Sequence, residues 1–285
     1  MNKRLYRWPD GKTLELGKKT LVMGILNVTP DSFSDGGKWN DVDLAIKHMK
    51  EMVEAGADII DIGAESSRPG FSPMSASDEI QRLEKYLKPI LEACPVPVSI
   101  DTFKSETAEF AAAAGVHILN DIWGLQYSEE PGLMAEVAAR YNLPVILMHN
   151  QANTEYNGDI IHCMKAFFGD GIKIAIEAGI KRDNIILDPG IGFGKTCEDN
   201  LYVMKRLEEI GEIEGCQYPV LLGTSRKSFI GKTLNLPVDE RMEATGATCV
   251  VGIMKGCDIM RVHDVAPIVK MCRITDAIMG AERHG

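Results

Sequence analysis

Eight short apolar runs, each followed by a longer segment of helical periodicity, recur along this 285-residue chain. Runs such as Val145-Ile146-Leu147-Met148 are apolar throughout, which is typical of parallel strands covered on both faces. The expected strands are residues 21–26, 58–62, 96–100, 116–119, 144–148, 184–187, 219–223 and 258–262. The expected helices are residues 41–55, 78–93, 105–114, 131–141, 159–179, 198–210, 240–255 and 265–280. An open doubly wound sheet would show the same alternation, but the count of eight favours a (β/α)8 TIM barrel.

The residues before the first apolar run predict a small additional element. Pro9-Asp10-Gly11 separates two strand-like stretches, so we expect residues 4–17 to form a β-hairpin that is placed to close the bottom of the barrel. No linker rich in Pro, Gly or Ser divides the rest of the chain. We therefore expect a single domain over residues 1–285, with the hairpin in 1–18 and the barrel in 19–282.

Charge and cysteine usage exclude several classes of protein. The net charge of −10 argues against a nucleic-acid-binding surface. The 7 cysteines are scattered and never spaced C-x-x-C, so we expect neither a disulfide framework nor a structural zinc site. No apolar stretch is long enough to cross a bilayer, and no apolar signal region follows the basic N-terminus. We therefore expect a cytoplasmic protein with no nucleic-acid or membrane partner.

Polar residues follow the expected strands. In a barrel the active site lies at the C-terminal ends of the strands, so these residues would ring one mouth. In chain order they are Asn27, Asp61, Asp101, Asn120 with Asp121, His149 with Asn150, Asp188, Thr224 with Ser225, and Arg261 with His263 and Asp264. A polar residue after a strand is often only a helix N-cap, which stays open as the alternative for Asp121 and Asp264. A scaffold does not require polar residues at all eight ends, so the ring predicts a binding site.

The predicted ring has two parts. One part offers hydrogen-bond donors and acceptors that could bind the edge of a flat heterocycle. It consists of Asp101, Asn120, Asp188 and Lys227. The other is an anion site, where barrels commonly bind phosphate, and it consists of Asn27, Arg261, His263 and residues 225–228. Arg68 and Arg226 are further cations nearby, and the alternative for Arg226 is a solvated loop charge.

Two loops carry unusual sequences. The loop that begins Asn27-Val28-Thr29-Pro30-Asp31-Ser32-Phe33-Ser34-Asp35-Gly36-Gly37 is too polar and too long for a simple connection, and such loops are usually functional or disordered. The loop Gly190-Ile191-Gly192-Phe193-Gly194-Lys195 has the spacing neither of a dinucleotide-binding fingerprint nor of a P-loop. We interpret it as a tight loop that brings Phe193 and the backbone close to a ligand.

With these motifs in place, the chain resembles the dihydropteroate synthase family. Four segments carry the resemblance, namely residues 23–37, 63–70, 187–195, and 225–228 together with 261–264. The resemblance implies a transferase on a barrel that joins a dihydropterin, supplied as its 6-hydroxymethyl diphosphate, to 4-aminobenzoate. The products are dihydropteroate and diphosphate. One departure is Ser67, where the family usually has Thr, and it keeps the hydroxyl group.

The resemblance also implies roles for individual residues. The pterin would be bound by Asp101, Asn120, Asp188, Lys227, Met148 and Phe193. The diphosphate would be bound by Asn27, Arg261, His263 and Arg68, with Mg²⁺ at Asn27. The 4-aminobenzoate would lie near Ser67, Arg68, Pro69, Phe33, Phe193, Lys227 and Ser228. Two mobile loops, residues 28–39 and 64–76, would close over the site, and the family tends to form homodimers.

The expected mechanism needs no protein nucleophile, because the aryl amine itself attacks. We expect diphosphate to leave first, with Mg²⁺, Arg261 and His263 stabilising its charge. Asp101, aided by Asn120, would stabilise the pterin cation, and Asp35 would orient the amine while the closed loop excludes water. The expected catalytic residues are therefore Asp101, Asp35, Lys227 and Asn120.

Three rival functions share parts of this pattern. A pterin-barrel methyltransferase acting on methyltetrahydrofolate would share the Asp-Asn-Asp ring but has no need for the diphosphate site. A non-catalytic pterin-binding paralogue would not need the intact loops. A phosphosugar isomerase or aldolase would need a base or Schiff-base lysine at a strand end, and Lys227 lies beyond its strand.

Overall fold

A closed ring of parallel strands forms the centre of the computed structural model, which describes residues 3–28, 41–65 and 74–282. The strand order is β11-β12-β3-β4-β5-β6-β7-β8. An isolated parallel bridge between Leu187 and Val220 joins the two ends of this order. The eight strands are β3 (Leu21–Asn27), β4 (Ile59–Gly63), β5 (Val98–Asp101), β6 (Ile118–Asp121), β7 (Val145–Met148), β8 (Ile185–Asp188), β11 (Leu221–Leu222) and β12 (Ile259–Val262). The predicted TIM barrel is confirmed, and the open doubly wound sheet is excluded.

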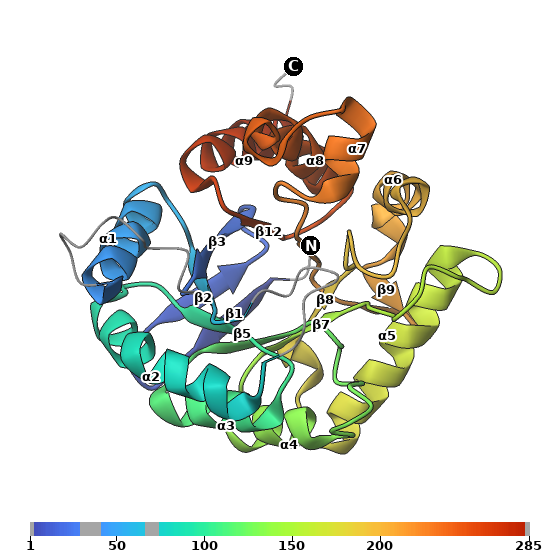
Figure 1. The fold of residues 1–285 in the computed structure, drawn as a ribbon. Helices are drawn as coiled ribbons and strands as arrows, with labels where there is room; N and C mark the ends of the chain where they lie inside the picture. The colour runs from blue at the N-terminus through green and yellow to red at the C-terminus, as the bar shows by residue number, and fades with distance from the viewer. Residues whose placement is uncertain (1–2, 29–40, 66–73, 283–285) are drawn as a thin grey trace.

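Helices surround the ring of strands on its outside (Figure 1). They are α1 (Asp41–Glu54), α2 (Ala76–Ala93), α3 (Ser105–Ala114), α4 (Leu133–Arg140), α5 (Ile160–Glu177), α6 (Cys197–Lys205), α7 (Ser228–Leu234), α8 (Met242–Met254) and α9 (Val265–Met279). Within the described ranges, no helix is long and apolar enough to cross a membrane. The sequence analysis gave no bounds for α7 and did not place the hairpin of β9 (Glu212–Ile213) and β10 (Cys216–Gln217). These elements are too short for hydrophobic periodicity to predict them.

The lower half of the barrel interior is apolar and is closed by the N-terminal hairpin. The hairpin pairs β1 (Arg4–Arg7) with β2 (Thr13–Leu16) in antiparallel register, as predicted. One buried cluster contains hairpin residues and barrel residues together, namely Tyr6, Leu14, Leu16, Leu21, Met23, Ile59, Ile118, Ile146, Ile186, Leu221 and Ile259. The expectation that the hairpin closes the bottom of the barrel is therefore confirmed.

The upper half of the interior is polar, and strand geometry explains why. Side chains along a strand alternate between its two faces, so a residue two positions beyond an interior residue also points inward. Of the residues two positions beyond the apolar layer, Asp61, Asn120, Asp188 and Arg261 are polar, whereas Ile25, Met148 and Gly223 are not. The period-2 repeat thus places one polar layer directly above one apolar layer, at the carboxyl ends of the strands.

The seam between β8 and β11 is the weakest joint of the ring. Among the described residues, the pairing between β8 and the segment of β11 is the single bridge of Leu187 with Val220. In contrast, β7 and β8 pair over four residues. Arg4 reaches this seam from the hairpin, and its Nη1 donates to Asp183 O at 3.0 Å and to Ile185 O at 2.9 Å. Its Nη2 donates to Gln217 O at 3.1 Å, on the segment that leads into β11. One buried guanidinium therefore ties both sides of the seam to the hairpin.

We predict that Arg4→Ala lowers the free energy of unfolding by about 2–3 kcal/mol, because it leaves three carbonyl groups without their charged donor. The change is measured as the urea-denaturation midpoint. Arg7→Ala is the matched control, because Arg7 lies exposed on the same strand. It should stay within about 0.5 kcal/mol of the wild type. Equal effects of the two substitutions would contradict the role given to Arg4.

Candidate active site

One arginine connects three strands in the polar layer. Arg261 on β12 donates from Nε to Asp61 Oδ2 at 2.6 Å and from Nη2 to Asp101 Oδ2 at 2.6 Å. Asn120 Nδ2 donates to the same Asp61 oxygen at 3.2 Å. The predicted residues Asp101, Asn120 and Arg261 therefore lie together. Asp61, which was predicted to belong to the ring of strand-end residues but was given no role there, lies at the centre of the network.

This network holds two carboxylates against one guanidinium. Asp61 is fully buried and Asp101 nearly so. Burial raises the pKa of Asp101 to about 7, and the nearby Asp61 carboxylate adds to the rise, while Arg261 opposes it. Asp101 is therefore a group that titrates near neutral pH, as functional groups often do.

Asp188 and Lys227 form the second charged pair of the layer. Asp188 ends β8 and is buried, and its Oδ1 accepts the Gly190 N–H at 2.7 Å. Burial raises the pKa of Asp188, while the charges of Lys227 and Arg261 lower it. Burial lowers the pKa of Lys227 to about 8, against the pull of Asp188. The Lys227 ammonium lies 4.7 Å from the centre of the Phe193 ring and donates to Ile191 O.

The remaining predicted residues take different places. Met148 ends β7, buried in the same layer as Asn120 and Asp188. Ser225 Oγ lies 2.9 Å from His263 Nδ1 and accepts the His263 N–H at 3.1 Å, so the turn after β11 and the end of β12 meet as expected for an anion site. Ser228 begins α7 and is exposed.

The three alternatives kept open at the sequence level, for Arg226, Asp264 and Asp121, are now decided. Arg226 is no free loop charge, because its Nε and Nη2 bind Asp264 at 2.9 and 2.5 Å. Asp264 stands at the N-cap position of α9, yet its side chain makes no capping hydrogen bond. Asp121 accepts the N–H groups of Trp123 and Leu125 at 2.8 and 2.7 Å, so it caps a turn rather than a helix.

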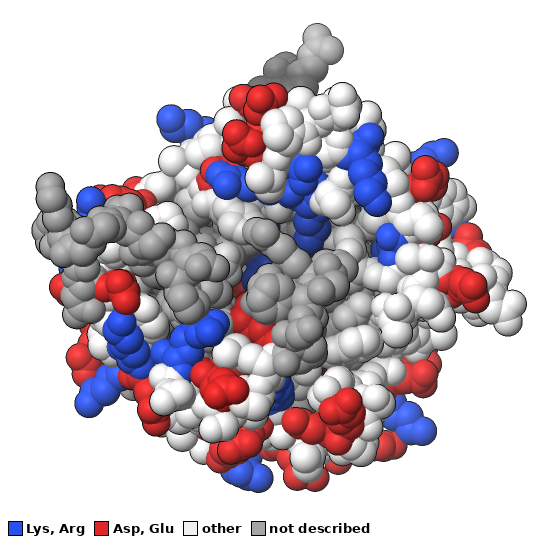
Figure 2. Space-filling model, viewed as in Figure 1, with Lys and Arg blue, Asp and Glu red and all other residues white. Residues whose placement is uncertain are grey.

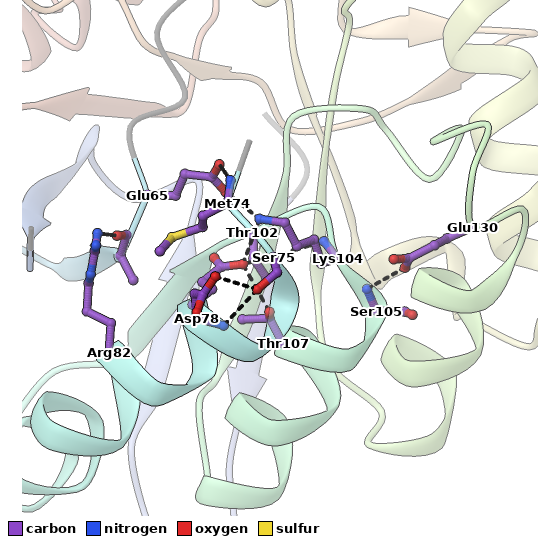
Figure 3. Close-up of polar contacts among 12 residues, drawn as sticks. Glu65, Met74, Ser75, Asp78, Arg82, Thr102, Lys104, Ser105, Thr107 and Glu130 are labelled. Carbon is purple, nitrogen blue, oxygen red and sulfur yellow. Dashed lines mark hydrogen bonds and ion pairs between the residues drawn. The ribbon is translucent and has the colours of Figure 1, made fainter. Parts of the chain in front are cut away.

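A buried ionic cluster lies beside the polar layer and was not predicted. Lys104 Nζ binds Glu79 Oε2 at 3.0 Å and also binds Glu65 Oε2. Glu65 Oε1 in turn accepts the Met74 N–H at 2.7 Å. Figure 3 shows Lys104 extending from the start of α3 toward Glu65, with Met74 beside it. Through these contacts the residues on either side of 66–73 are tied to each other and to α3.

Several predicted residues lie outside the described ranges. They are Phe33 and Asp35 on the first loop, and Ser67, Arg68 and Pro69 on the second. Their predicted roles, and the closure of the loops over residues 28–39 and 64–76, are not tested by the geometry.

The side chains of the site offer few ligands for a metal ion. Within residues 3–28, 41–65 and 74–282, no group of three or more His, Cys, Asp or Glu side chains could hold one. Asn27 ends β3 at the rim of the polar layer. Its side-chain amide oxygen lies next to Gly63 at the end of β4, since a Cβ added to Gly63 would be 3.4 Å from that oxygen. Mg²⁺ binds few protein oxygens when it arrives with substrate phosphates and keeps several waters. A single amide oxygen fits a magnesium ion that is shared with a diphosphate.

The chain is acidic as a whole, but basic groups gather near the barrel axis. Figure 2 shows Lys and Arg side chains in and around a hollow at the middle of one face, with Asp and Glu more toward its margin. The described polar layer contributes Arg261 and Lys227. These two cations lie among the carboxylates of Asp61, Asp101 and Asp188, and Arg261 keeps N–H groups that could bind an anionic ligand.

Comparisons with known proteins agree with this geometry. A family model described as "Pterin binding enzyme" matches residues 23–263. The dihydropteroate synthase of Clostridium beijerinckii is 54% identical over 272 residues, covering 94% of this chain and 97% of that protein. The dihydropteroate synthase of Bacillus subtilis is 52% identical, covering 95% of this chain and 94% of that protein.

Solved structures give the same result. The dihydropteroate synthase of Clostridium difficile, crystallised in the presence of pteroic acid, has a TM-score of 0.87 and 49% identity, covering 92% of this chain and 98% of that one. The Xanthomonas albilineans enzyme with 4-aminobenzoic acid has a TM-score of 0.88 and 35% identity, covering 96% and 97% of the two chains.

Proposed function

This chain belongs to the family of pterin-binding enzymes and, within it, to the dihydropteroate synthases, and on that basis we propose that it makes 7,8-dihydropteroate for folate biosynthesis. The substrates are (7,8-dihydropterin-6-yl)methyl diphosphate and 4-aminobenzoate, and diphosphate is released. The observation that carries the proposal is the polar layer in which Arg261 binds both Asp61 and Asp101, beside Asn120, Asp188 and Lys227.

The polar layer suits a pterin because it offers both hydrogen-bond donors and acceptors at one end of the barrel. The carboxylates of Asp101 and Asp188 accept hydrogen bonds, as the amino and ring N–H groups of a pterin require. The amide of Asn120 and the ammonium of Lys227 donate to its carbonyl and ring nitrogen atoms. Met148 and Phe193 supply apolar surface for the ring faces.

The leaving diphosphate suits the region where β12 and the turn after β11 meet. Only two of the five N–H groups of Arg261 are used by Asp61 and Asp101, so the guanidinium can also donate to an anion. Ser225 and His263 contact each other where the turn after β11 meets the end of β12. Asn27 would hold Mg²⁺ together with the diphosphate, and bound Mg²⁺ supplies charge neutralisation of the leaving group.

Bond breaking then needs stabilisation of a cation on the pterin-methyl carbon. Asp101 is a buried carboxylate of the layer whose pKa is raised by burial and lowered by the bound guanidinium of Arg261. We propose that its negative charge, supported by Asn120, stabilises the cation before the amine of 4-aminobenzoate attacks. The closed first loop would keep water away from that cation and so protect it from hydrolysis.

The loop residues complete the proposal. Asp35 would orient the amine, and Phe33, Ser67, Arg68 and Pro69 would line the 4-aminobenzoate and diphosphate positions together with Ser228. In an activity assay Asp35→Ala should lower kcat while leaving pterin affinity largely intact. A loss of pterin affinity alone would contradict the role given to Asp35. The cytoplasmic location likewise stays a prediction.

A homodimer is also part of the proposal. Four side chains on α8 and α9 are apolar and more than half exposed, namely Met254, Ile274, Ile278 and Met279. The two helices pack against each other, so these side chains belong to one region of the surface. Exposed apolar surface of this kind marks association sites.

The central test is diphosphate release from the pterin diphosphate. We predict release that requires both 4-aminobenzoate and Mg²⁺, measured with a coupled phosphate assay, with dihydropteroate as the product by chromatography. A methyltransferase or a non-catalytic paralogue would release no diphosphate under these conditions. Absence of release with both substrates and Mg²⁺ present would overturn the proposal.

The raised pKa of Asp101 predicts the acid side of the pH profile. Because the pKa is about 7, the carboxylate is mostly protonated at pH 6, so kcat/KM for the pterin diphosphate should rise about tenfold from pH 6 toward pH 8 and then level off. Asp101→Asn should lower kcat/KM by about 100-fold or more and flatten this rise. The same acid limb in the Asn variant would assign it to another group.

The dimer is tested by sedimentation velocity. We predict a dimer for the wild type and a monomer for Ile278→Glu, because a buried unpaired carboxylate would cost several kcal/mol at the interface. The matched control is Ile176→Glu on α5, another exposed apolar position outside α8 and α9. A monomeric wild type, or dissociation by the control substitution alone, would contradict the assignment of this surface.

A further inference from the structure

Lys195 is a buried lysine whose role the proposed reaction does not explain. Its side chain is only 8% exposed. Its Nζ donates to Gly190 O at 3.0 Å and to Phe193 O at 3.1 Å, and lies 2.9 Å from His149 Nδ1. An ammonium has three donors and no acceptor, so His149 accepts through Nδ1. The three groups bonded to this ammonium are all uncharged.

The two carbonyl groups bound by Lys195 are the ends of one turn. Phe193 N–H donates to Gly190 O at 3.0 Å, which closes a four-residue turn. The carbonyl between them, Ile191 O, accepts from Lys227 instead. The Phe193 ring lies 4.7 Å from the Lys227 ammonium. The Lys227 ammonium therefore contacts the Ile191 carbonyl and the Phe193 ring, and both belong to the turn that Lys195 binds.

The turn also packs tightly against the segment after β7. Gly190 has a φ of +61°, and a Cβ there would lie 1.9 Å from His149 O. The backbone of the turn thus touches the residue whose ring accepts from Lys195. Burial lowers the pKa of His149, which keeps its ring neutral and able to accept. Lys195, His149 and the turn form one hydrogen-bonded unit behind the polar layer.

Burying the charge of the Lys195 ammonium costs free energy, because the ammonium loses its hydration. Burial lowers the pKa of Lys195 to about 7, and Asp188 opposes the change. An apolar side chain of similar length would avoid the desolvation cost of the ammonium. The charge does act on the site, because Lys195 is among the cations that lower the pKa of Asp188. A buried cation that touches one wall of the site and favours an ionised site carboxylate points to a functional role.

We propose that Lys195 is a positioning residue for the pterin site, whose ammonium fixes the turn of residues 190–193 and thereby the places of Lys227 and Phe193. Asp188 is bound to the same turn, because its Oδ1 accepts the Gly190 N–H at 2.7 Å, and the charge of Lys195 supports its negative charge. The proposal rests on the proposed function for its kinetic consequences. Its geometric consequence, the fixed turn, is independent of which reaction the site performs.

Two variants separate the donor from the charge. Lys195→Met removes both, and Lys195→Gln keeps an amide that can donate to the turn. We expect kcat/KM for the pterin diphosphate to fall about 100-fold in Lys195→Met, because small displacements of binding groups cost about that much. Lys195→Gln should recover about tenfold of this loss. Lys205→Met, which removes an exposed lysine of α6, is the matched control and should match the wild type.

The pH dependence of binding identifies the charge effect. Calorimetric affinity for the pterin diphosphate, without 4-aminobenzoate, is measured at pH 6 and pH 8. Both Lys195 variants lose the cation beside Asp188, so both should show a larger ratio of affinity at pH 8 to affinity at pH 6 than the wild type. A merely structural role would leave this ratio unchanged. Ratios equal to that of the wild type in both variants would overturn the electrostatic part.

A crystal structure of Lys195→Met tests the geometry without any activity. The expected result is a rotated turn in which Lys227 no longer contacts Ile191 O. If Lys195→Met does not fold, the structure and kinetics of Lys195→Gln decide. An unchanged turn together with kcat/KM within threefold of the wild type would overturn the proposal. A wild type that binds the pterin diphosphate but releases no diphosphate would instead overturn the proposed function, while the structure of the variant would still test the turn.

Discussion

The guanidinium of Arg261 between Asp61 and Asp101 is the interaction on which the site depends. It joins β12 to β4 and β5 through the interior of the barrel, with both donor–acceptor distances at 2.6 Å. Burying such a network removes three charges from water, so it is weak evidence for stability. What it provides is a fixed local electrostatic field. Burial raises the pKa of Asp101 to about 7, against the opposing charge of Arg261, and the Asp61 carboxylate adds to the rise. The arginine still has N–H groups for an anion.

The apolar lower layer makes this arrangement possible. The isoleucines of β4, β6, β7, β8 and β12 fill the barrel beneath the polar residues, and Tyr6, Leu14 and Leu16 of the hairpin close it from below. Water can therefore approach the charged groups only from the carboxyl ends of the strands. Charges in a site closed on one side act more strongly than in bulk water. The apolar core thus fills the lower part of the barrel and the polar site lies at the carboxyl ends of the strands, as is general for this fold.

Much of this could be predicted from the sequence because it follows from local pattern. Continuous apolar runs predicted the eight strands, and Pro9-Asp10-Gly11 predicted the hairpin. Residues at strand ends, such as Asn120 and Asp188, were found because the fold brings all strand ends together. Asp61 was placed in the ring of strand-end residues but given no role in binding, because it lies inside its strand rather than after it. The sequence did contain an indication of its role, because Asp61 is a carboxylate at an inward-facing position of an otherwise apolar strand.

Pairings between distant residues could not be predicted. Arg226 binds Asp264, and Lys104 binds Glu65 and Glu79, across separations that no local pattern records. The role of Lys195 needed the hydrogen bonds of its ammonium, since its motif resembled a phosphate loop only superficially. Short elements such as α7 and β9 were missed because two to seven residues carry too little periodicity.

The central claim is that burial and a shared arginine set the charge state of Asp101. It is tested most directly by a ¹³C NMR titration of the Asp101 carboxyl group in the wild type and in Arg261→Met. The account predicts a pKa near 7 in the wild type and a higher value in the variant, because the one cation bound to both carboxylates is lost. A wild-type pKa close to the ordinary aspartate value, or no rise on removing Arg261, would contradict it.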